Sequence, residues 1–249
     1  MNIIQTWKTK VIPDHYVTFV DKIKTNNPTC NYMFFDDNDI ADFIQNKMPE
    51  YKDTFYMLSG KIQQIDFFRY LAIYYYGGLY LDLDIDASES FDTLAMTSPD
   101  KCIFPVELKN IGDSLITNQQ FYKLIGNYAF YAPAHHPFLK LIIDNIVTQR
   151  ISDTDIYIGQ LSNRDDARDV YVYYRTGPML VTQSYLDYIN NDCLDGNVDA
   201  SQSGSIILLE PTPYMPNCFG NYGKHCCYGS WRHVHSLQTP MHPSSLHVE

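Results

Sequence analysis

The chain has 249 residues, of which 45% are hydrophobic and 19% charged, a composition typical of a globular protein with one sizeable core. The formal net charge of -11 disfavours a nucleic acid as the partner, because a phosphate backbone attracts basic surfaces. No apolar run reaches the roughly 18 residues that a transmembrane helix needs, and no targeting segment is recognised before the first apolar residues. Six cysteines without such a signal favour free thiols in a reducing compartment. We therefore expect a cytoplasmic protein.

Strand and helix patterns alternate along the first part of the chain. Residues 3–7 and 31–35 predict strands, and residues 14–25 predict a helix between them. The acidic cluster at 36–39 predicts the start of a second helix, because aspartate side chains accept hydrogen bonds from the first backbone N–H groups. Residues 62–76 predict the clearest helix, which a Gly-Gly pair would end in a left-handed conformation. This order predicts an α/β fold with a mainly parallel sheet flanked by helices.

The second half of the chain alternates less regularly. Residues 138–147 and 178–189 predict helices, and residues 205–209 predict a strand. The polar segments 150–168 and 195–204 predict loops.

The segment GGLYLDLDIDAS, residues 77–88, follows the clearest predicted helix. If it is a strand, Asp82, Asp84 and Asp86 lie on one face together with Tyr80, because side chains alternate along an extended chain. Like charges on one strand face repel each other. An ordinary solvated edge strand is therefore disfavoured, and a bound cation would explain the carboxylates.

Two kinds of cation site are compatible with this spacing at first sight. A calcium loop of the EF-hand type is excluded, because the required glycine and bidentate glutamate positions hold Ala87 and Thr93. A Mg²⁺ or Mn²⁺ site remains, since both ions prefer carboxylate and phosphate oxygens. The sequence has neither a GxxxxGK[ST] loop nor a GxGxxG turn, so a metal ion would have to hold the phosphates of a nucleotide.

Four segments resemble glycosyltransferase family 32, the sugar-binding-region family with a DXD motif: IQTWKTKVIP, DFFRYLAIYYYGGLYLDLDID, RTGP and HCCYGSW. That family includes the yeast initiating α-1,6-mannosyltransferase and is related more distantly to the large clostridial glucosylating toxins. The resemblance implies a GT-A fold, a UDP- or GDP-sugar donor and a Mn²⁺ or Mg²⁺ cofactor. It also implies transfer of a hexose or N-acetylhexosamine, with retention, to a glycan or another hydroxyl acceptor.

The resemblance assigns roles to the acidic segment and to the helix before it. Asp82 and Asp84 correspond to the DXD pair, with Asp84 on the metal and Asp82 on the ribose or a metal-bound water. His225 is a candidate third metal ligand. Asp66 and Arg69 correspond to the Asp-x-x-Arg pair that faces the ribose and sugar of the donor; an ordinary intrahelical ion pair is the alternative.

The remaining expected contacts to the donor come from five segments. Trp7 would stack on the base, unless it is a core residue, and Tyr80 would pack on the ribose. A turn at 176–178 borders the donor sugar in the family, and the segment 225–231 is expected to close over the donor as a lid. The expected substrate-binding residues are Thr6, Trp7, Tyr80, Asn127, Thr176, Gly177, Pro178, Ser230 and Trp231.

Several alternatives remain at this point. His225 could join Cys226, Cys227, His233 or His235 in a zinc site, although no CxxC or HxxxH spacing supports one. Asp86 lies beyond the DXD pair, so it would either surround the metal ligands without binding the metal or merely face solvent. Two substitutions depart from the family pattern, since a histidine is missing from Ile-Ile-Gln-Thr-Trp and Gln64 replaces a basic residue.

We expect one catalytic domain over residues 1–249. Residues 1–90 would bind the nucleotide sugar, residues 91–235 would supply the acceptor side and the lid, and 236–249 form a tail. The expected reaction is front-face attack, because no carboxylate is recognised on the far face of the sugar. The rival functions are a non-catalytic sugar-nucleotide or metal-binding protein and an effector-like enzyme that glycosylates a protein.

Overall fold

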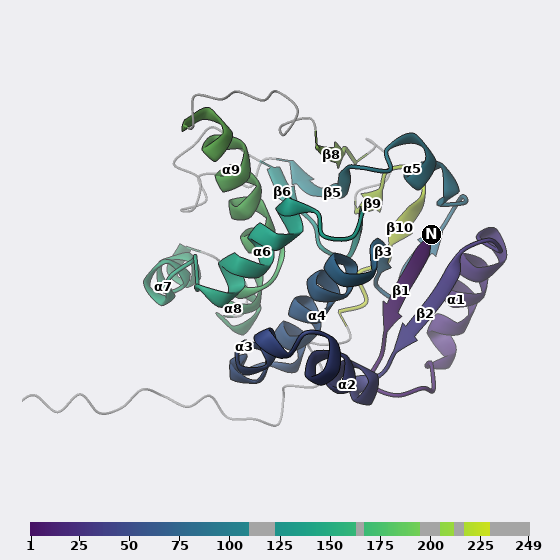
Figure 1. Ribbon diagram of the computed structural model, residues 1–249, viewed down its shortest axis with the longest axis horizontal. Helices are drawn as coiled ribbons and strands as arrows, with labels where there is room; N and C mark the ends of the chain where they lie inside the picture. The colour runs from purple at the N-terminus through teal and green to yellow at the C-terminus, as the bar shows by residue number, and fades with distance from the viewer. Residues whose placement is uncertain (110–122, 163–166, 195–204, 212–216, 230–249) are drawn as a thin grey trace, which may run out of the picture.

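The computed structural model describes residues 1–109, 123–162, 167–194, 205–211 and 217–229. A seven-stranded sheet forms its centre, with the order β2-β1-β3-β7-β5-β6 and with β8 paired to β5 (Figure 1). The strands of this sheet are β1 (Asn2–Thr6), β2 (Asn31–Phe35), β3 (Gly78–Leu81), β5 (Cys102–Lys109), β6 (Lys123–Ile125), β7 (Ala129–Ala132) and β8 (Ile206–Leu209). A smaller sheet contains β4 (Ile85–Ala87), β10 (Gly223–His225) and β9 (Cys218–Phe219).

The large sheet is mainly parallel, as expected for a GT-A fold. Strands β1, β2 and β3 pair in parallel, and β8 pairs in parallel with β5. Strand β7 is antiparallel to both β3 and β5, so β5 runs in the same direction as β3. Only β6 and β7 run against the other strands of this sheet within the described residues. The predicted fold class is confirmed.

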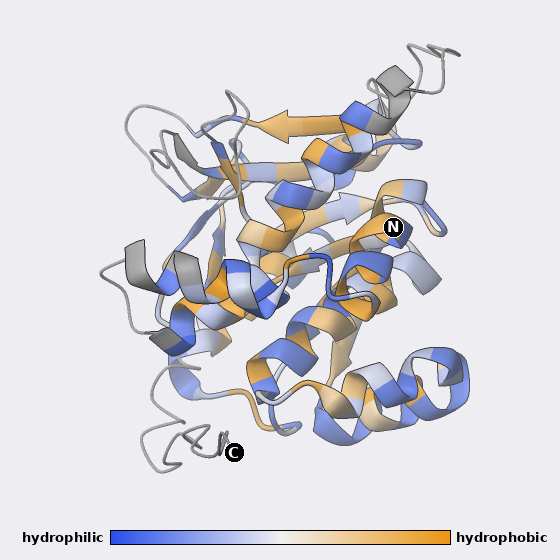
Figure 2. Cartoon of the chain, turned by 90° about the vertical axis from the view of Figure 1, so that its left-hand side faces the viewer, coloured by the Kyte–Doolittle hydropathy of each residue, from blue (hydrophilic) through white to orange (hydrophobic). Residues whose placement is uncertain are grey.

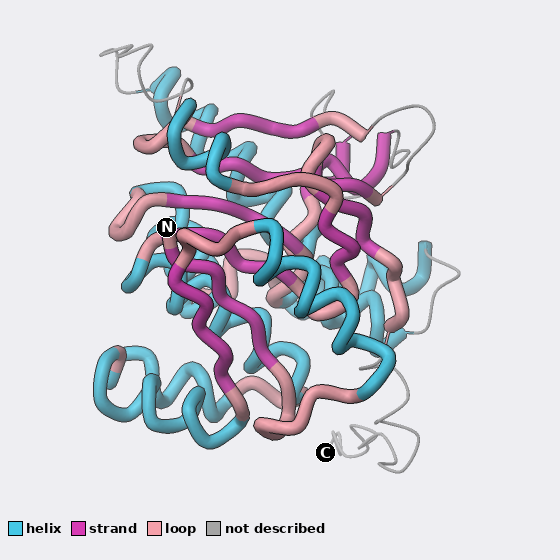
Figure 3. Tube along the Cα trace, turned by 90° about the vertical axis from the view of Figure 1, so that its right-hand side faces the viewer, coloured by secondary structure: helices cyan, strands magenta, loops and turns pink. Residues whose placement is uncertain are grey.

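Helices cover both faces of the sheet. They are α1 (Asp14–Asn26), α2 (Asp37–Lys47), the short 3-10 helix η1 (Pro49–Tyr51), α3 (Lys52–Met57), α4 (Lys61–Tyr76), α5 (Asp92–Thr97), α6 (Pro137–Val147), α7 (Asp153–Ser162), α8 (Ala167–Arg175) and α9 (Pro178–Leu194). Figure 3, seen from the side of α1, shows this helix beside β1 and β2. In the described part of the chain, no helix combines the length and the apolar character needed to cross a membrane.

Neighbouring residues of one strand enter different cores, because side chains alternate between the faces of a sheet. Ile4 and Tyr80 belong to the core that packs against α2, α4, α6 and α9. Ile3 and Leu79 belong to the core on the other face, which includes Ile23 of α1. Figure 2 shows the strands as mainly hydrophobic and the helices as carrying long hydrophilic stretches. The two cores hold β3 at the centre of the molecule.

Local signals placed most of the predicted elements correctly, with ends shifted by a few residues. Asp36 caps α2 by accepting hydrogen bonds from the backbone N–H groups of Asn38 and Asp39, as the acidic cluster predicted. Gly77 follows the last residue of α4 with a φ of 64°, so the predicted left-handed end of this helix is confirmed. Strand β8 confirms the strand predicted near its position.

The prediction of one continuous acidic strand is wrong. Strand β3 ends at Leu81, the next residues form a turn, and β4 then pairs with β10 in the small sheet. Leu83 therefore leaves the face that Leu79 and Leu81 share, and it packs against Tyr16 of α1. Side chains alternate between two faces only along an extended backbone. Here the backbone turns after Leu81, and β4 pairs with β10 away from the large sheet.

The prediction of a loop over residues 150–168 is also wrong. Helix α7 occupies most of this segment, and α8 begins at its end. Ser152 and Asp155 form a reciprocal cap: the Asp155 N–H donates to Ser152 Oγ at 3.1 Å, and the Ser152 N–H donates to Asp155 Oδ2 at 3.3 Å. Ile156 is 1% exposed and anchors the helix on the core. The predicted loop at 195–204 and the tail at 236–249 lie outside the described residues.

Candidate active site

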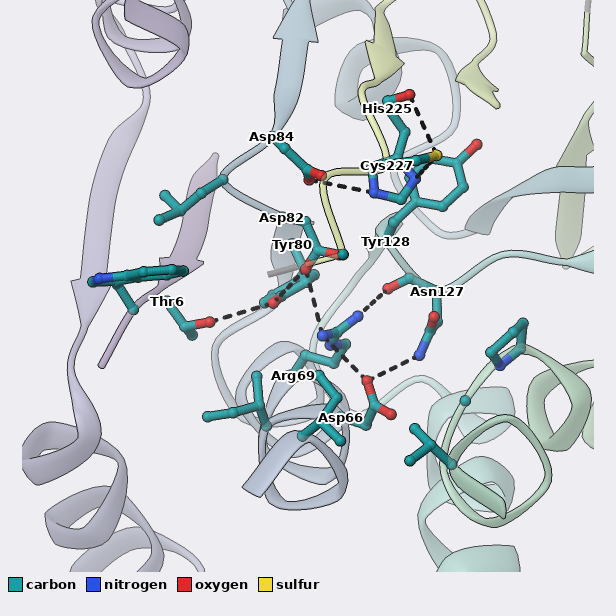
Figure 4. A pocket seen from close by; sticks show the side chains of 18 of the residues that line it. Thr6, Asp66, Arg69, Tyr80, Asp82, Asp84, Asn127, Tyr128, His225 and Cys227 are labelled. Atoms are coloured by element: carbon teal, nitrogen blue, oxygen red, sulfur yellow. Dashed lines mark hydrogen bonds and ion pairs between the residues drawn. The ribbon is translucent and has the colours of Figure 1, made fainter. Parts of the chain in front are cut away.

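Asp82, Asp84 and His225 meet at the carboxyl end of β3. The turn after β3 supplies the two aspartates, and β10 supplies the histidine (Figure 4). One ligand atom from each of the three side chains lies within 4.8 Å of the other two. Within the described residues, no cysteine belongs to this cluster, and His233 and His235 lie outside the described range. The three side chains are therefore close enough to hold one cation, and their role as metal ligands stays a prediction.

Asp84 is held in place by the segment that follows β10. The Tyr228 N–H donates to Asp84 Oδ2 at 2.9 Å, and His225 Nε2 lies 3.3 Å from Asp84 Oδ1. Burial would raise the pKa of Asp84, but the hydrogen bonds and the charge of His225 lower it below its usual value. Burial would lower the pKa of His225, but the hydrogen bonds to Asp84 and Cys227 and the nearby carboxylates raise it to about 10. The two side chains thus form an ion pair.

Asp82 is held in place by side chains of β3 and α4. The Tyr80 hydroxyl donates to Asp82 Oδ1 at 2.9 Å, and Arg69 Nη2 lies 3.4 Å from the same oxygen. Burial, together with the charge of Asp84, raises the pKa of Asp82 against the opposing effect of Arg69. The ring of Tyr80 is 1% exposed, with the Arg69 guanidinium 4.6 Å from its centre. Tyr80 therefore positions Asp82, and its contact with a ribose stays a prediction.

Asp66 and Arg69 form the centre of a buried polar network, and each is 3% exposed. Arg69 Nη2 lies 3.1 Å from Asp66 Oδ1, and Arg69 Nη1 donates to the Asn127 carbonyl at 2.8 Å. Thr176 Oγ1 donates to Asp66 Oδ2 at 2.8 Å, and Asn127 Nδ2 donates to Asp66 Oδ1 at 3.2 Å. Burial raises the pKa of Asp66 to about 6, although Arg69, Thr176 and Asn127 oppose this shift. Four residues from three distant segments of the sequence thus meet here.

Tyr70 completes this network and was not predicted from the sequence. Its hydroxyl donates to the Thr176 carbonyl at 2.9 Å and accepts a hydrogen bond from Asn127 Nδ2 at 2.9 Å. Tyr70 lies four residues after Asp66 on α4, so both point to the same side of the helix. That spacing is the signal that could have identified it.

One cavity of about 280 Å³ unites the cluster and the network. Trp7 lies at its wall half-buried, with its ring edge-on to Tyr16 at 5.3 Å between ring centres. Thr176 is fully buried and supports the wall from behind. The predicted residues that line the cavity are Thr6, Trp7, Asp66, Arg69, Tyr80, Asp82, Asp84, Asn127, Gly177, Pro178 and His225. Ser230 and Trp231 lie outside the described residues, so the lid at 225–231 stays a prediction.

Tyr128 and Cys227 also line the cavity and were not predicted. The Tyr128 ring stacks on His225 with 4.3 Å between ring centres, and its carbonyl accepts a hydrogen bond from the Asp82 N–H at 2.8 Å. Cys227 Sγ lies 3.4 Å from His225 Nδ1. Asp86, by contrast, pairs with Lys22 Nζ at 2.6 Å on the surface, which agrees with the solvated alternative. Tyr128 thus contacts two of the three candidate metal ligands.

Comparison with known proteins identifies relatives of the chain. Residues 13–100 match the family described as the glycosyltransferase sugar-binding region containing a DXD motif. Inositol phosphoceramide mannosyltransferase 3 of Schizosaccharomyces pombe is 28% identical over 144 residues, which are 58% of this chain and 36% of that protein. Mannosyl phosphorylinositol ceramide synthase CSH1 of Saccharomyces cerevisiae is 29% identical over 212 residues, 85% of this chain and 47% of that protein. The chain thus spans about a third to a half of these curated relatives.

Among solved structures, the PaToxG glycosyltransferase has a TM-score of 0.48 and 16% identity, and the match covers 81% of this chain and 73% of that one. The UDP-bound glycosyltransferase domain of the YGT toxin has a TM-score of 0.40 and 10% identity, with 83% and 78% covered. The sequence match over 13–100 includes Asp66, Arg69, Asp82 and Asp84. Residues 13–100 are therefore similar to the glycosyltransferase sugar-binding region containing a DXD motif.

Proposed function

We propose that the protein is a metal-dependent glycosyltransferase that moves a hexose from a nucleotide-diphosphate sugar to a hydroxyl acceptor, with retention of configuration. The observation that carries the proposal is the meeting of Asp82, Asp84 and His225 in one cavity with the Asp66–Arg69 network. The names of the curated relatives make mannose the first sugar to test and a hydroxyl of an inositol phosphoceramide the first acceptor. N-acetylhexosamine donors and protein acceptors follow in the same screen.

The donor set of the cluster fits Mn²⁺ or Mg²⁺. Two carboxylates and one imidazole would supply three ligands on one side, provided that His225 gives up its proton when the cation binds, which leaves room for phosphate oxygens and water on the other. Asp84, with its lowered pKa, offers a full negative charge. A bound cation would supply the positive charge that stabilises the departing nucleoside diphosphate.

The side chains around the cluster position the donor. Arg69 pairs with both Asp66 and Asp82, which offsets part of their negative charge and holds the two carboxylates in place at the cavity. Asn127 lines the same wall, and because its two Nδ2 hydrogens go to Asp66 and Tyr70, its Oδ1 would accept hydrogen bonds from the sugar hydroxyls. At the other end, Thr6 and Trp7 would contact the ribose and the base. Holding donor and acceptor in one geometry lowers the barrier by reducing the entropy lost in the reaction step.

Retention by front-face attack is the mechanism that these contacts support. Asp66 and Asp82 both contact Arg69, and Asp84 would bind the cation, so each of these three carboxylates would have a positive partner. A nucleophile that attacks the anomeric carbon needs a lone pair that is not engaged in this way. We therefore expect none of these three to be the nucleophile, and we propose that the incoming hydroxyl attacks on the face that the diphosphate leaves, with a phosphate oxygen taking its proton.

The expected location in the cytoplasm and the division of the chain near residue 90 also stay proposals. Cys30, Cys102, Cys218, Cys226 and Cys227 are free thiols, which supports a reducing compartment.

The test is a nucleotide-release screen of GDP-mannose, UDP-glucose and UDP-N-acetylglucosamine with Mn²⁺, first without and then with simple sugar acceptors. We expect one donor to be hydrolysed slowly without an acceptor, and EDTA to stop the release. The anomeric proton of a transferred sugar, read by NMR, decides between retention and inversion. Donor binding without any release would favour the non-catalytic binding protein, and a protein acceptor would favour the effector-like enzyme.

A further inference from the structure

Glu107 is a carboxylate of the cavity that none of the steps above uses. It lies on β5, at the point where the pairing with β6 changes register. Val106 pairs with Ile125 and Leu108 pairs with Leu124, so Glu107 is the extra residue of a β-bulge. Bulges of this kind turn a side chain away from its regular direction and occur often beside active sites. The bulge gives a local reason why a carboxylate on this strand lines the cavity.

A glycine opposite the bulge leaves room for the Glu107 carboxylate. A methyl group at Gly126 would lie 3.3 Å from Glu107 Oε2 and 2.8 Å from Cε1 of Tyr128. The absence of a side chain at Gly126 therefore lets the carboxylate and the Tyr128 ring approach the same point. Because Tyr128 stacks on His225, this point lies on the His225 side of the candidate metal site.

Glu107 is not part of the candidate metal site itself. The ligand atoms that come within 4.8 Å of one another belong to Asp82, Asp84 and His225. A carboxylate that lines the same cavity but lies outside this ligand set can contact the sugar attached to a metal-bound diphosphate. An ionised carboxylate accepts hydrogen bonds from two neighbouring hydroxyl groups and repels another carboxylate.

We propose that Glu107 binds hydroxyl groups of the sugar carried by the donor and thereby selects neutral sugars over hexuronic acids. This inference rests on the proposed function, because it assumes a nucleotide-sugar donor in the cavity. On this proposal the nucleoside diphosphate alone makes no contact with Glu107. The residue therefore acts on the choice of sugar, while Asp82, Asp84 and His225 act on the phosphates.

The experiment compares Glu107→Gln and Glu107→Ala with the wild type on matched donors, either GDP-mannose and GDP-mannuronate or UDP-glucose and UDP-glucuronate. We expect kcat/KM for the neutral donor to fall by about ten- to a hundredfold in Glu107→Ala, as is typical when a hydrogen bond to a charged group is lost. The preference for the neutral donor over the hexuronate donor should shrink in both variants. The Kd of GDP or UDP with Mn²⁺ should stay within about twofold of the wild-type value.

Glu50→Gln is the matched control, because Glu50 lies exposed in η1 and its replacement removes the same charge. Unfolding midpoints of all variants show whether each one folds, and Glu107→Gln keeps the shape of the side chain if the alanine variant does not. Equal weakening of the donor and of the nucleoside diphosphate would overturn the proposal, since Glu107 would then act on the phosphates. An unchanged sugar preference would also overturn it. A wild type that releases no nucleotide from any donor would instead overturn the proposed function, and this inference with it.

Discussion

Replacing Tyr70 with phenylalanine tests the buried network behind the cavity, because it removes a single oxygen atom. The Tyr70 side chain is fully buried on α4, and burial raises the pKa of its hydroxyl, which therefore stays protonated. That hydroxyl donates to the Thr176 carbonyl and accepts from Asn127 Nδ2, both at 2.9 Å. Tyr70→Phe keeps the ring in the core and leaves these two groups without this partner.

The size of the effect follows from the two lost hydrogen bonds. Asn127 Nδ2 keeps its hydrogen bond to Asp66 at 3.2 Å, so the loss of its hydrogen bond to the Tyr70 hydroxyl costs about 0.5–1.5 kcal/mol. The Thr176 carbonyl loses its donor inside the core, which costs about 1–3 kcal/mol. We expect the free energy of unfolding to fall by about 1.5–4.5 kcal/mol in total, which lowers the Tm by roughly 3–18 °C in a protein of this size. Because Asn127 lines the cavity, we also expect kcat/KM for the donor to fall by about tenfold, as for one lost positioning contact.

Urea and thermal unfolding measure the first effect, and donor hydrolysis with Mn²⁺ measures the second. The matched control is Tyr75→Phe, which removes the same atom from a half-buried ring on the same helix. We expect this control to change the Tm by no more than about 2 °C, as is usual outside buried networks. A Tyr70→Phe variant that matches the control in both stability and activity would refute the reasoning, since Asn127 and Thr176 would then hold Asp66 without Tyr70.

Three further changes test other parts of the structure. Asp84→Asn should lower the rate of sugar transfer several-hundredfold and leave the circular dichroism spectrum unchanged, because an amide supplies no negative charge to a divalent cation. Unchanged turnover would contradict the metal site. His136 accepts the Phe138 N–H at the start of α6, and burial lowers its pKa below the usual 6.5. As the pH falls below about 6.5, His136 is therefore protonated in the unfolded chain before it is protonated in the folded protein, and the free energy of unfolding declines. His136→Asn keeps a side-chain acceptor at this position and should flatten that decline in unfolding experiments at pH 5 to 8. Parallel pH profiles of the variant and the wild type would contradict this. Gly77→Ala should lower the free energy of unfolding by more than about 1 kcal/mol, because the φ of Gly77 is positive and the new Cβ would lie 2.7 Å from the Ala134 backbone nitrogen. Gly60→Ala is the control, since its Cβ would lie 3.5 Å from the nearest atom, and it should have only a mild effect.

The sequence by itself determined the features that depend on neighbours a few residues apart. The cap of α2 at Asp36 and the end of α4 at Gly77 follow from local backbone hydrogen bonds and from the freedom of glycine. Asp66 and Arg69 lie three residues apart on a helix, so their pairing could be predicted from spacing alone. The DXD spacing likewise singled out Asp82 and Asp84, because that pattern is contiguous in the chain.

Only the tertiary structure decided where the strand after Gly77 ends and what surrounds its aspartates. Pairing between β4 and β10 turns the chain at Asp82 and brings Asp84 to His225, two residues that are far apart in the sequence. The same holds for Tyr128 stacked on His225 and for the bulge that carries Glu107 to the cavity. Strand register and long-range pairing depend on how distant segments pack together, and the periodicity of any single segment contains no information about the partner it will meet.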